Sequence, residues 1–492
     1  MSAALWTAGG DARLGGRAAL LGGANLFDYA SQFLLPIVLA RSLDAEAFGQ
    51  YRLLWLVTGT VMAIAPMAMP ASLFYFWPRA DAAMRRLYLL QALVFMTVAG
   101  ALSAACVGPW NPWLPQGLRD LASGAALMQA FVALWVLTSL LDQLPIVDER
   151  VRWQALATIA LAVLRTAAVA AAAAWSRALI PVLWALLAFA LAKLALLLYY
   201  VLRHHGLGGP LLRMRALQEQ LGYATPFGLS GALYTLRVQA DQWVVATLFS
   251  VTAFASFSIA GVFGPLLQVF RQTASSIVLP SMGRSEASGN LGAMIDLNSR
   301  ANVLVAALVC PLFALLFAFA EDIVAVVYTR AYIDAAPVMR IYVLGFAALI
   351  VELSSLTLLL REGRFMLRLN LWMLVLCAAL TAAGALQWGV IGAAWGSVAA
   401  QWIDRGATLW RIARVTALPW RRLQDWRGLG VALCNATLSG SLAWAVVEPG
   451  LELASPGSRV LVGSLVLAAS SAALAALDRR GPLRWPRLSA EE

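Results

Sequence analysis

The sequence predicts an all-α polytopic membrane protein with about fourteen transmembrane helices. Of its 492 residues, 61% are hydrophobic and only 12% are charged, and the mean hydropathy is +0.77. A soluble domain is usually about half apolar and about a quarter charged. Apolar stretches of roughly 20 residues or more, the length that crosses a bilayer as a helix, recur along the whole chain. The loops between them are too short to fold as separate soluble domains.

The apolar stretches place the transmembrane helices in order along the chain. We expect spans at 17–40, 50–77, 87–108, 120–144, 154–174, 180–202, 221–249, 252–280, 300–320, 338–360, 369–387, 391–410, 427–447 and 459–477. The first is too long for the core of a signal peptide and holds Asp28 at its centre, so we expect it to be retained. Six spans precede the seventh, so the two halves of the chain enter the membrane in the same direction.

The net charge of +11 follows a topological pattern. If the N-terminus is cytoplasmic, most of the 36 lysines and arginines lie in cytoplasmic loops and tails, and few lie in outer loops. This is the positive-inside bias, and it places both termini in the cytoplasm. A nucleic-acid partner is not needed to explain the basic excess.

The sequence carries no sign of a cofactor or a metal. Its four cysteines, Cys106, Cys310, Cys377 and Cys434, lie in apolar stretches and are interpreted as small core residues without disulfides. We find no metal-ligand cluster, Walker loop or nucleophile elbow. The sequence therefore favours a protein that is not an enzyme.

The seventh span carries a polar stripe. Ser230, Tyr234, Arg237 and Asp241 are spaced by four, three and four residues, which puts them on one face of a helix. An arginine or aspartate at bilayer depth costs roughly 2.5–3.5 kcal/mol on insertion scales. The stripe is therefore a candidate transport pathway, although Arg237 and Asp241 could also simply neutralise each other.

An internal repeat relates the two halves. Residues 47–51 read Ala-Phe-Gly-Gln-Tyr and residues 253–257 read Ala-Phe-Ala-Ser-Phe, at an offset of 206 residues and at the same place in the helix order. The same offset carries the stripe Asn25, Asp28, Gln32 of the first span to within one residue of the stripe of the seventh. We expect two bundles related by an axis along the membrane normal.

The remaining charges inside spans indicate an anionic substrate. A diphosphate that crosses a low-dielectric barrier needs cationic partners, and guanidinium groups suit phosphate because they donate in a planar fork. The candidate diphosphate-binding residues are Arg165, Lys193, Arg237 and Arg271. The candidate ion-coupling residues are Asp28, Asp241 and Glu352; Glu352 has no polar companion one helical turn away, so we expect it to carry a proton.

Each of these charges also has a purely structural interpretation. Arg271 could extend its head group to the interface. Arg165 and Lys193 could form pairs between helices, and residues 404–405 could be an interfacial ion pair. The loop at 148–150 is expected to be solvated, with a latch between the two lobes as the alternative.

Several segments resemble the Wzx-type polysaccharide flippases of the multidrug/oligosaccharidyl-lipid/polysaccharide (MOP) superfamily. Residues 39–55, ending the first span and starting the second, look like the start of these proteins. Residues 241–260 are similar to their acid-led seventh helix and the turn after it. Residues 321–341 resemble their short amphipathic stretch between helices 9 and 10.

The resemblance implies two six-helix bundles, 1–205 and 206–412, in a V around a central cavity, with two further helices and a tail at 413–492. It implies a flippase in the bacterial inner membrane that moves undecaprenyl-diphosphate-linked oligosaccharide by ion- or potential-coupled alternating access. Its partners would be that substrate, membrane lipids, and polysaccharide polymerase and chain-length machinery, with no nucleic acid. The alternatives are a cation-coupled multidrug exporter of the same superfamily and a membrane polysaccharide polymerase or ligase. The last is disfavoured because both histidines, His204 and His205, lie on the cytoplasmic side.

Overall fold

The computed structural model describes residues 8–206, 208, 210–448 and 455–477, and every regular element among them is helical. Eleven of these described helical segments are long and apolar enough to cross a membrane. Helices α1 (Ala8–Ser42) and α10 (Met214–Leu248) cover two more of the expected spans, and α17 (Gly363–Thr416) covers two by itself. The prediction of an all-α membrane protein with about fourteen spans is confirmed.

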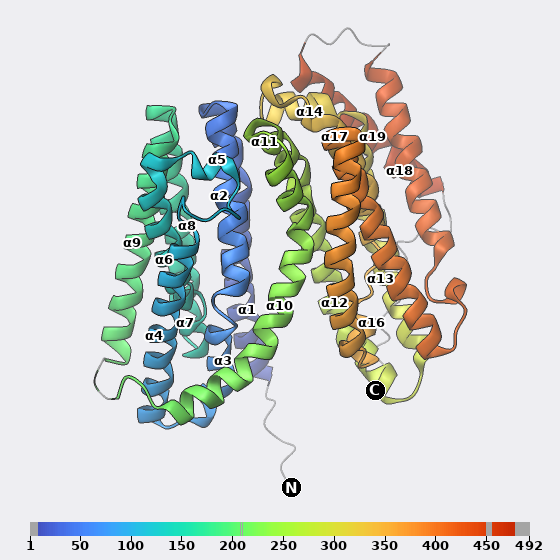
Figure 1. The fold of residues 1–492 in the computed structure, drawn as a ribbon. Helices are drawn as coiled ribbons and strands as arrows, with labels where there is room; N and C mark the ends of the chain where they lie inside the picture. The colour runs from blue at the N-terminus through green and yellow to red at the C-terminus, as the bar shows by residue number, and fades with distance from the viewer. Residues whose placement is uncertain (1–7, 207, 209, 449–454, 478–492) are drawn as a thin grey trace. The chain divides into compact units, whose positions relative to one another are not determined.

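The chain divides into two compact units, and the division falls inside α10, between Gln239 and Ala240. The first unit also includes Ser250–Ala255. Its other helices are α2 (Ala45–Ile64), α3 (Met69–Phe76), α4 (Ala82–Cys106), α5 (Gln116–Arg119), α6 (Ala125–Thr138), α7 (Leu144–Val147), α8 (Val151–Ser176) and α9 (Leu179–His204). Within this unit α1 packs on α8, α8 on α9, α9 on α6 and α6 on α4 (Figure 1).

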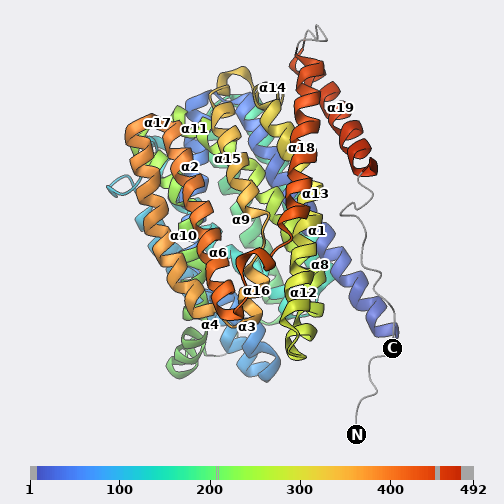
Figure 2. The same cartoon turned by 90° about the vertical axis from the view of Figure 1, so that its right-hand side faces the viewer.

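The second unit contains Ala240–Phe249 and the chain from Ser256 onward. Its helices are the second half of α11 (Val251–Ala260), then α12 (Gly264–Ala287), α13 (Leu291–Ala318), α14 (Ala320–Val327), α15 (Ala335–Leu349), α16 (Ser354–Leu359), α17, α18 (Trp426–Val447) and α19 (Pro456–Leu477). Helix α13 packs against α12 and α18, α18 packs against α19, and α15 packs against α17 (Figure 2). The three-part division at 205/206 and 412/413 stays a prediction.

Helix α17 is a hairpin of two helices. The backbone leaves helical geometry at Trp388 and Gly389, and Gly389 has a φ of 63°, which favours glycine. The two arms touch through their backbones: a Cβ on Gly384 would lie 2.1 Å from the carbonyl oxygen of Gly392. The expected spans 369–387 and 391–410 are therefore two antiparallel arms joined by a tight turn.

Several expected spans are interrupted rather than continuous, and the interruptions of two of them contain an acid. The span at 120–144 changes from α6 to a 3₁₀ turn, η3 (Ser139–Asp142), before α7. The span at 338–360 unwinds between α15 and α16, over 350–353. Neither interruption contains a glycine, and Pro145 follows the first one, so local sequence carries little signal for them. Each interruption instead contains an acid, Asp142 or Glu352.

The cysteines differ partly from the expectation. Cys310 and Cys377 are buried, as predicted, whereas Cys106 and Cys434 are exposed. The prediction of a core position was wrong for these two because each lies on an outward-facing side of its helix, where a small apolar side chain also suits lipid.

Candidate functional site

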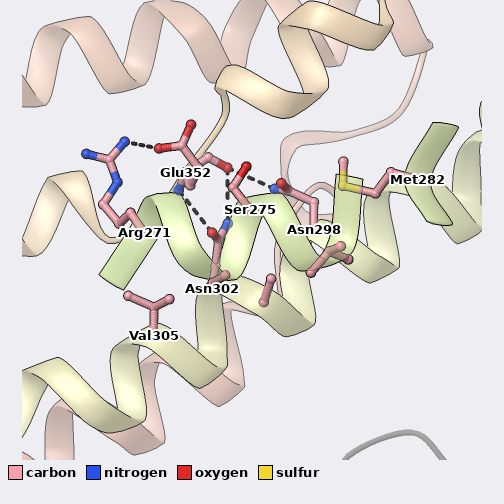
Figure 3. A pocket seen from close by; sticks show the side chains of 10 residues that line it. Arg271, Ser275, Met282, Asn298, Asn302, Val305 and Glu352 are labelled. Atoms are coloured by element: carbon pink, nitrogen blue, oxygen red, sulfur yellow. Dashed lines mark hydrogen bonds and ion pairs between the residues drawn. The ribbon is translucent and has the colours of Figure 1, made fainter. Parts of the chain in front are cut away.

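Glu352 is the centre of a polar cluster in the second unit (Figure 3). Its carboxylate forms an ion pair with Arg271 of α12, and the Arg271 and Glu352 side chains are only 8% and 12% exposed. Arg271 also donates to Gln268 over 3.3 Å. Glu352 has no polar companion one helical turn away, as the sequence shows, and its partner comes instead from another helix. Arg271 is likewise buried and does not extend to an interface.

Two asparagines of α13 hold the unwound backbone at Glu352. The backbone N–H of Glu352 donates to Asn302 Oδ1 over 3.0 Å. Its carbonyl accepts from Asn298 Nδ2 at 2.9 Å and from Asn302 Nδ2 at 3.3 Å. An unsatisfied backbone group costs several kcal/mol inside a bilayer. The side chains of Asn298 and Asn302 therefore satisfy the backbone groups that the interruption leaves without partners in a helix.

The Glu352 carboxylate also starts the next helix, since its Oε1 accepts the backbone N–H of Ser354 over 2.6 Å. Beside it lies a cavity of about 10 Å³ lined by Arg271, Ser275, Asn298, Asn302 and Glu352 (Figure 3). That is about the space one water molecule needs. Ser275 is hydrogen-bonded to Ser355 of α16 across the same junction.

Asp241 is the second buried acid of this unit, and its side chain joins three helices. It is 6% exposed. Its Oδ2 accepts from the Tyr342 hydroxyl of α15 at 2.5 Å and from the Ser397 hydroxyl of α17 at 2.7 Å. The polar stripe predicted Asp241 but missed Tyr342 and Ser397, because each stands on a helix distant in sequence without a stripe of its own.

Arg237 is half-buried on α10, on the other side of the division between the units. Its guanidinium lies 5.5 Å from the centre of the Tyr234 ring. A guanidinium over an aromatic face is attracted by the ring quadrupole. Tyr234 itself is 48% exposed.

In the first unit, Asp28 and Arg165 join α1 to α8. Arg165 Nη2 lies 2.9 Å from Asp28 Oδ1 and donates to Ser31 Oγ over 3.3 Å. Gln32 donates to the other carboxylate oxygen of Asp28 over 2.8 Å. Arg165 is buried whereas Asp28 is 28% exposed at its side chain. Asp28, in the polar stripe of the first span, is therefore the ion-pair partner of Arg165 on α8.

Lys193 is also paired. Its ammonium lies 2.9 Å from Asp142, in the interruption between α6 and α7, and 5.2 Å from the centre of the Trp135 ring. Arg165 and Lys193 therefore each form an ion pair with an acid of another element, as the structural interpretation of these two bases expected. Asp404 and Arg405 form the expected pair at 3.8 Å, but they are buried, and Arg405 also donates to the Val351 carbonyl over 3.5 Å.

Asp148 was expected to be solvated, and this was wrong. Its carboxylate accepts from the Tyr200 hydroxyl at 2.6 Å and contacts His205 Nε2 at 2.8 Å, with a side chain only 9% exposed. Burial opposes ionisation, but the hydrogen bonds from His205 and Tyr200 outweigh it, and the pKa of the Asp148 carboxyl is lowered. The chain returns to this loop at the end of α9, which local sequence could not indicate.

The fold is that of MOP superfamily membrane transporters. The structure of the lipid II flippase MurJ, in an inward closed conformation, is similar with a TM-score of 0.70 and 12% identity, over 92% of this chain and 98% of that one. An inward-facing multidrug resistance MATE family transporter of the MOP superfamily is similar with a TM-score of 0.59 and 14% identity, over 80% and 94%. A Vibrio cholerae MATE transporter, VcmN, is similar with a TM-score of 0.54 and 13% identity, over 82% and 98%. At such identities the likeness establishes the fold alone.

The family is established by the sequence itself. Residues 38–337 match the family described as "Polysaccharide biosynthesis protein", which is more than half of the chain. The chain belongs to this family, and the resemblance noted from its motifs is confirmed. No curated protein matches the chain.

Proposed function

We propose that the protein is a flippase that moves undecaprenyl-diphosphate-linked oligosaccharide across the bacterial inner membrane by ion- or potential-coupled alternating access. Membership of the polysaccharide biosynthesis family supports the class of substrate. The observation that carries the proposal furthest is the set of basic side chains inside apolar helices. Such groups are costly in a membrane and are kept where they serve a substrate or an ion.

Arg237 is the first candidate for the diphosphate. Three of the four candidate bases, Arg165, Lys193 and Arg271, are paired with carboxylates within their own units. Arg237 is only half-buried, and its guanidinium lies over the half-exposed Tyr234 ring. A guanidinium that is partly exposed can donate in a planar fork to a phosphate group.

Asp241 is the leading candidate for ion coupling, with Asp28 in the first unit as the second. The hydroxyls of Tyr342 and Ser397 and one backbone N–H surround the Asp241 carboxylate. A carboxylate held by neutral donors inside a membrane can be neutralised by a proton or a cation. We also propose cytoplasmic termini, three parts at 1–205, 206–412 and 413–492, and partners among the polysaccharide polymerase and chain-length machinery.

The test is reconstitution of the full chain in liposomes with a fluorescent prenyl-diphosphate-linked oligosaccharide. Wild-type protein should move the lipid between leaflets, Arg237→Ala should lose at least about tenfold in rate, equal to about 1.4 kcal/mol, and Arg237→Lys should keep part of it. Val238→Ala, a neighbouring exposed apolar position, is the matched control and should transport normally. Accumulation of cationic dyes without movement of the lipid-linked sugar would instead indicate a multidrug exporter.

A further inference from the structure

The ion pair between Arg271 and Glu352 lies at the interruption of the α15–α16 span, beside the water-sized cavity. Packing alone does not require it, since replacing a buried ion pair by apolar side chains is often neutral or stabilising. The first unit also has an acid at an interruption paired with a buried base: Asp142, after α6, pairs with Lys193. The fourth expected span of each half therefore carries an acid at a break, and a base from another helix pairs with that acid.

Only one member of the pair can change its charge. Arginine stays protonated in proteins, whereas a carboxylate can take up a proton. If Glu352 becomes neutral, the Arg271 guanidinium is left as an excess charge in a low-dielectric place, which favours binding of another anion. Guanidinium groups bind carboxylate and phosphate with the same forked geometry, so a phosphate oxygen can take the place of the Glu352 oxygen.

The cavity leaves room for a water molecule beside Glu352. It touches the Glu352 side chain and is lined by the polar groups of Ser275, Asn298 and Asn302 (Figure 3). A site of this size with several polar partners suits one water molecule. The same carboxylate accepts the Ser354 N–H at the start of α16, so its protonation also weakens the start of that helix.

We propose that Arg271 exchanges anions: Glu352 holds it until Glu352 takes up a proton from water, and a phosphate oxygen of the substrate then replaces the carboxylate. Release of the substrate returns Arg271 to Glu352, and the proton goes back to water. The proposal rests on the proposed flippase function and adds a coupling step to it. It makes substrate binding in the second unit depend on one proton.

Several other charged groups near this junction have local partners. On α17, Asp404 faces Arg405, and Arg405 donates to the Val351 carbonyl. On α13, Asp296 and Arg300 pair with each other at 3.9 Å on an exposed face. Before α18, Asp425 accepts the Gly428 N–H over 2.8 Å. Glu352 is therefore the titrating group that faces Arg271 in this cluster.

The test is equilibrium binding of a prenyl-diphosphate-linked N-acetylglucosamine to the full chain in nanodiscs between pH 5.5 and 8. Each phosphate of this probe carries one ester and one anhydride bond and a single strongly acidic oxygen, so it keeps its charge over the range. Wild-type affinity should rise on acidification, by at most about tenfold per pH unit because one proton is taken up. Glu352→Gln should bind tightly at every pH, and Arg271→Ala weakly at every pH.

Two further variants complete the experiment. Glu362→Gln is the matched control, since Glu362 pairs with Arg411 in the same unit at 2.9 and 3.0 Å, and it should keep the wild-type pH dependence. The double variant Arg271→Met with Glu352→Met leaves no unpaired charge, so it should fold, bind weakly and show no pH dependence. Equal pH dependence in wild type and Glu352→Gln overturns the exchange and leaves the flippase standing. Absence of wild-type binding at every pH contradicts the flippase itself.

Discussion

At the scale of single residues, the described spans hold their buried bases by carboxylates that stand far away in sequence. Arg165 and Asp28 are 137 residues apart, and Arg271 and Glu352 are 81 apart. The free-energy cost of a charge in an apolar helix was enough to select these residues from the sequence as candidate site residues. The pairing itself depends on which helices are neighbours, so no local pattern contained it.

Asp148 provides a prediction at this scale. Asp148→Ala leaves the Tyr200 hydroxyl and His205 without their buried acceptor, so we expect a loss of about 1–3 kcal/mol in the free energy of unfolding near neutral pH. Because the folded-state pKa of Asp148 is lowered, its stabilisation is present above the usual carboxyl pKa of 3.8 and is lost as pH falls through the lowered value. The difference in Tm from wild type should therefore shrink in strong acid.

Thermal unfolding in detergent across a pH series measures this. The control is Asp296→Ala, which removes an exposed ion pair with Arg300 and should change stability by less than about 1 kcal/mol. If the difference in Tm between wild type and Asp148→Ala grows toward low pH, the ionised Asp148 carboxylate is not the stabilising form.

At the scale of elements, the spans end and break for different reasons. The turn inside α17 has a local cause, since Gly389 supplies a positive φ. The interruption at 350–353 has a tertiary cause, because Asn298 and Asn302 of α13 satisfy the freed backbone groups of Glu352. Hydropathy therefore predicted the two arms of α17 and missed the break between α15 and α16.

The close contact between the arms of α17 is testable with alanine. Gly384→Ala places a methyl group against the Gly392 backbone at 2.1 Å, so we expect about 1–3 kcal/mol of destabilisation. Gly406→Ala, in the second arm with open space around it, should be neutral or stabilising by up to about 1 kcal/mol. Tm values of the two purified variants give the comparison, and equal values would mean that the arms do not approach as closely as described.

At the scale of the whole molecule, topology is the property that the charge pattern predicts. We expect Trp113→Cys, in an outer loop, to react with a membrane-impermeant maleimide in spheroplasts. Arg215→Cys, in the first turn of α10 on the expected cytoplasmic side, should react only after the membrane is opened. Both positions are well exposed, at 84% and 92%.

The labelling requires a background in which the two exposed native cysteines, Cys106 and Cys434, are replaced by alanine. Labelling of Arg215→Cys in intact spheroplasts would reverse the predicted orientation. The expected basic residues of the tail at 479–487 lie outside the described residues, so this experiment also tests the topology that they support.

The sequence by itself determined the class of protein, its spans and the residues whose charge is costly in a membrane. It could do so because hydropathy, span length and charge are properties of contiguous residues. A bilayer core of about 30 Å favours long apolar segments and disfavours charged ones, whatever the tertiary contacts are. Only the tertiary structure decided that Glu352 holds Arg271, that Tyr342 and Ser397 surround Asp241, and that the tenth span is broken. Those facts depend on contacts between helices distant in sequence, which packing selects and no local pattern records.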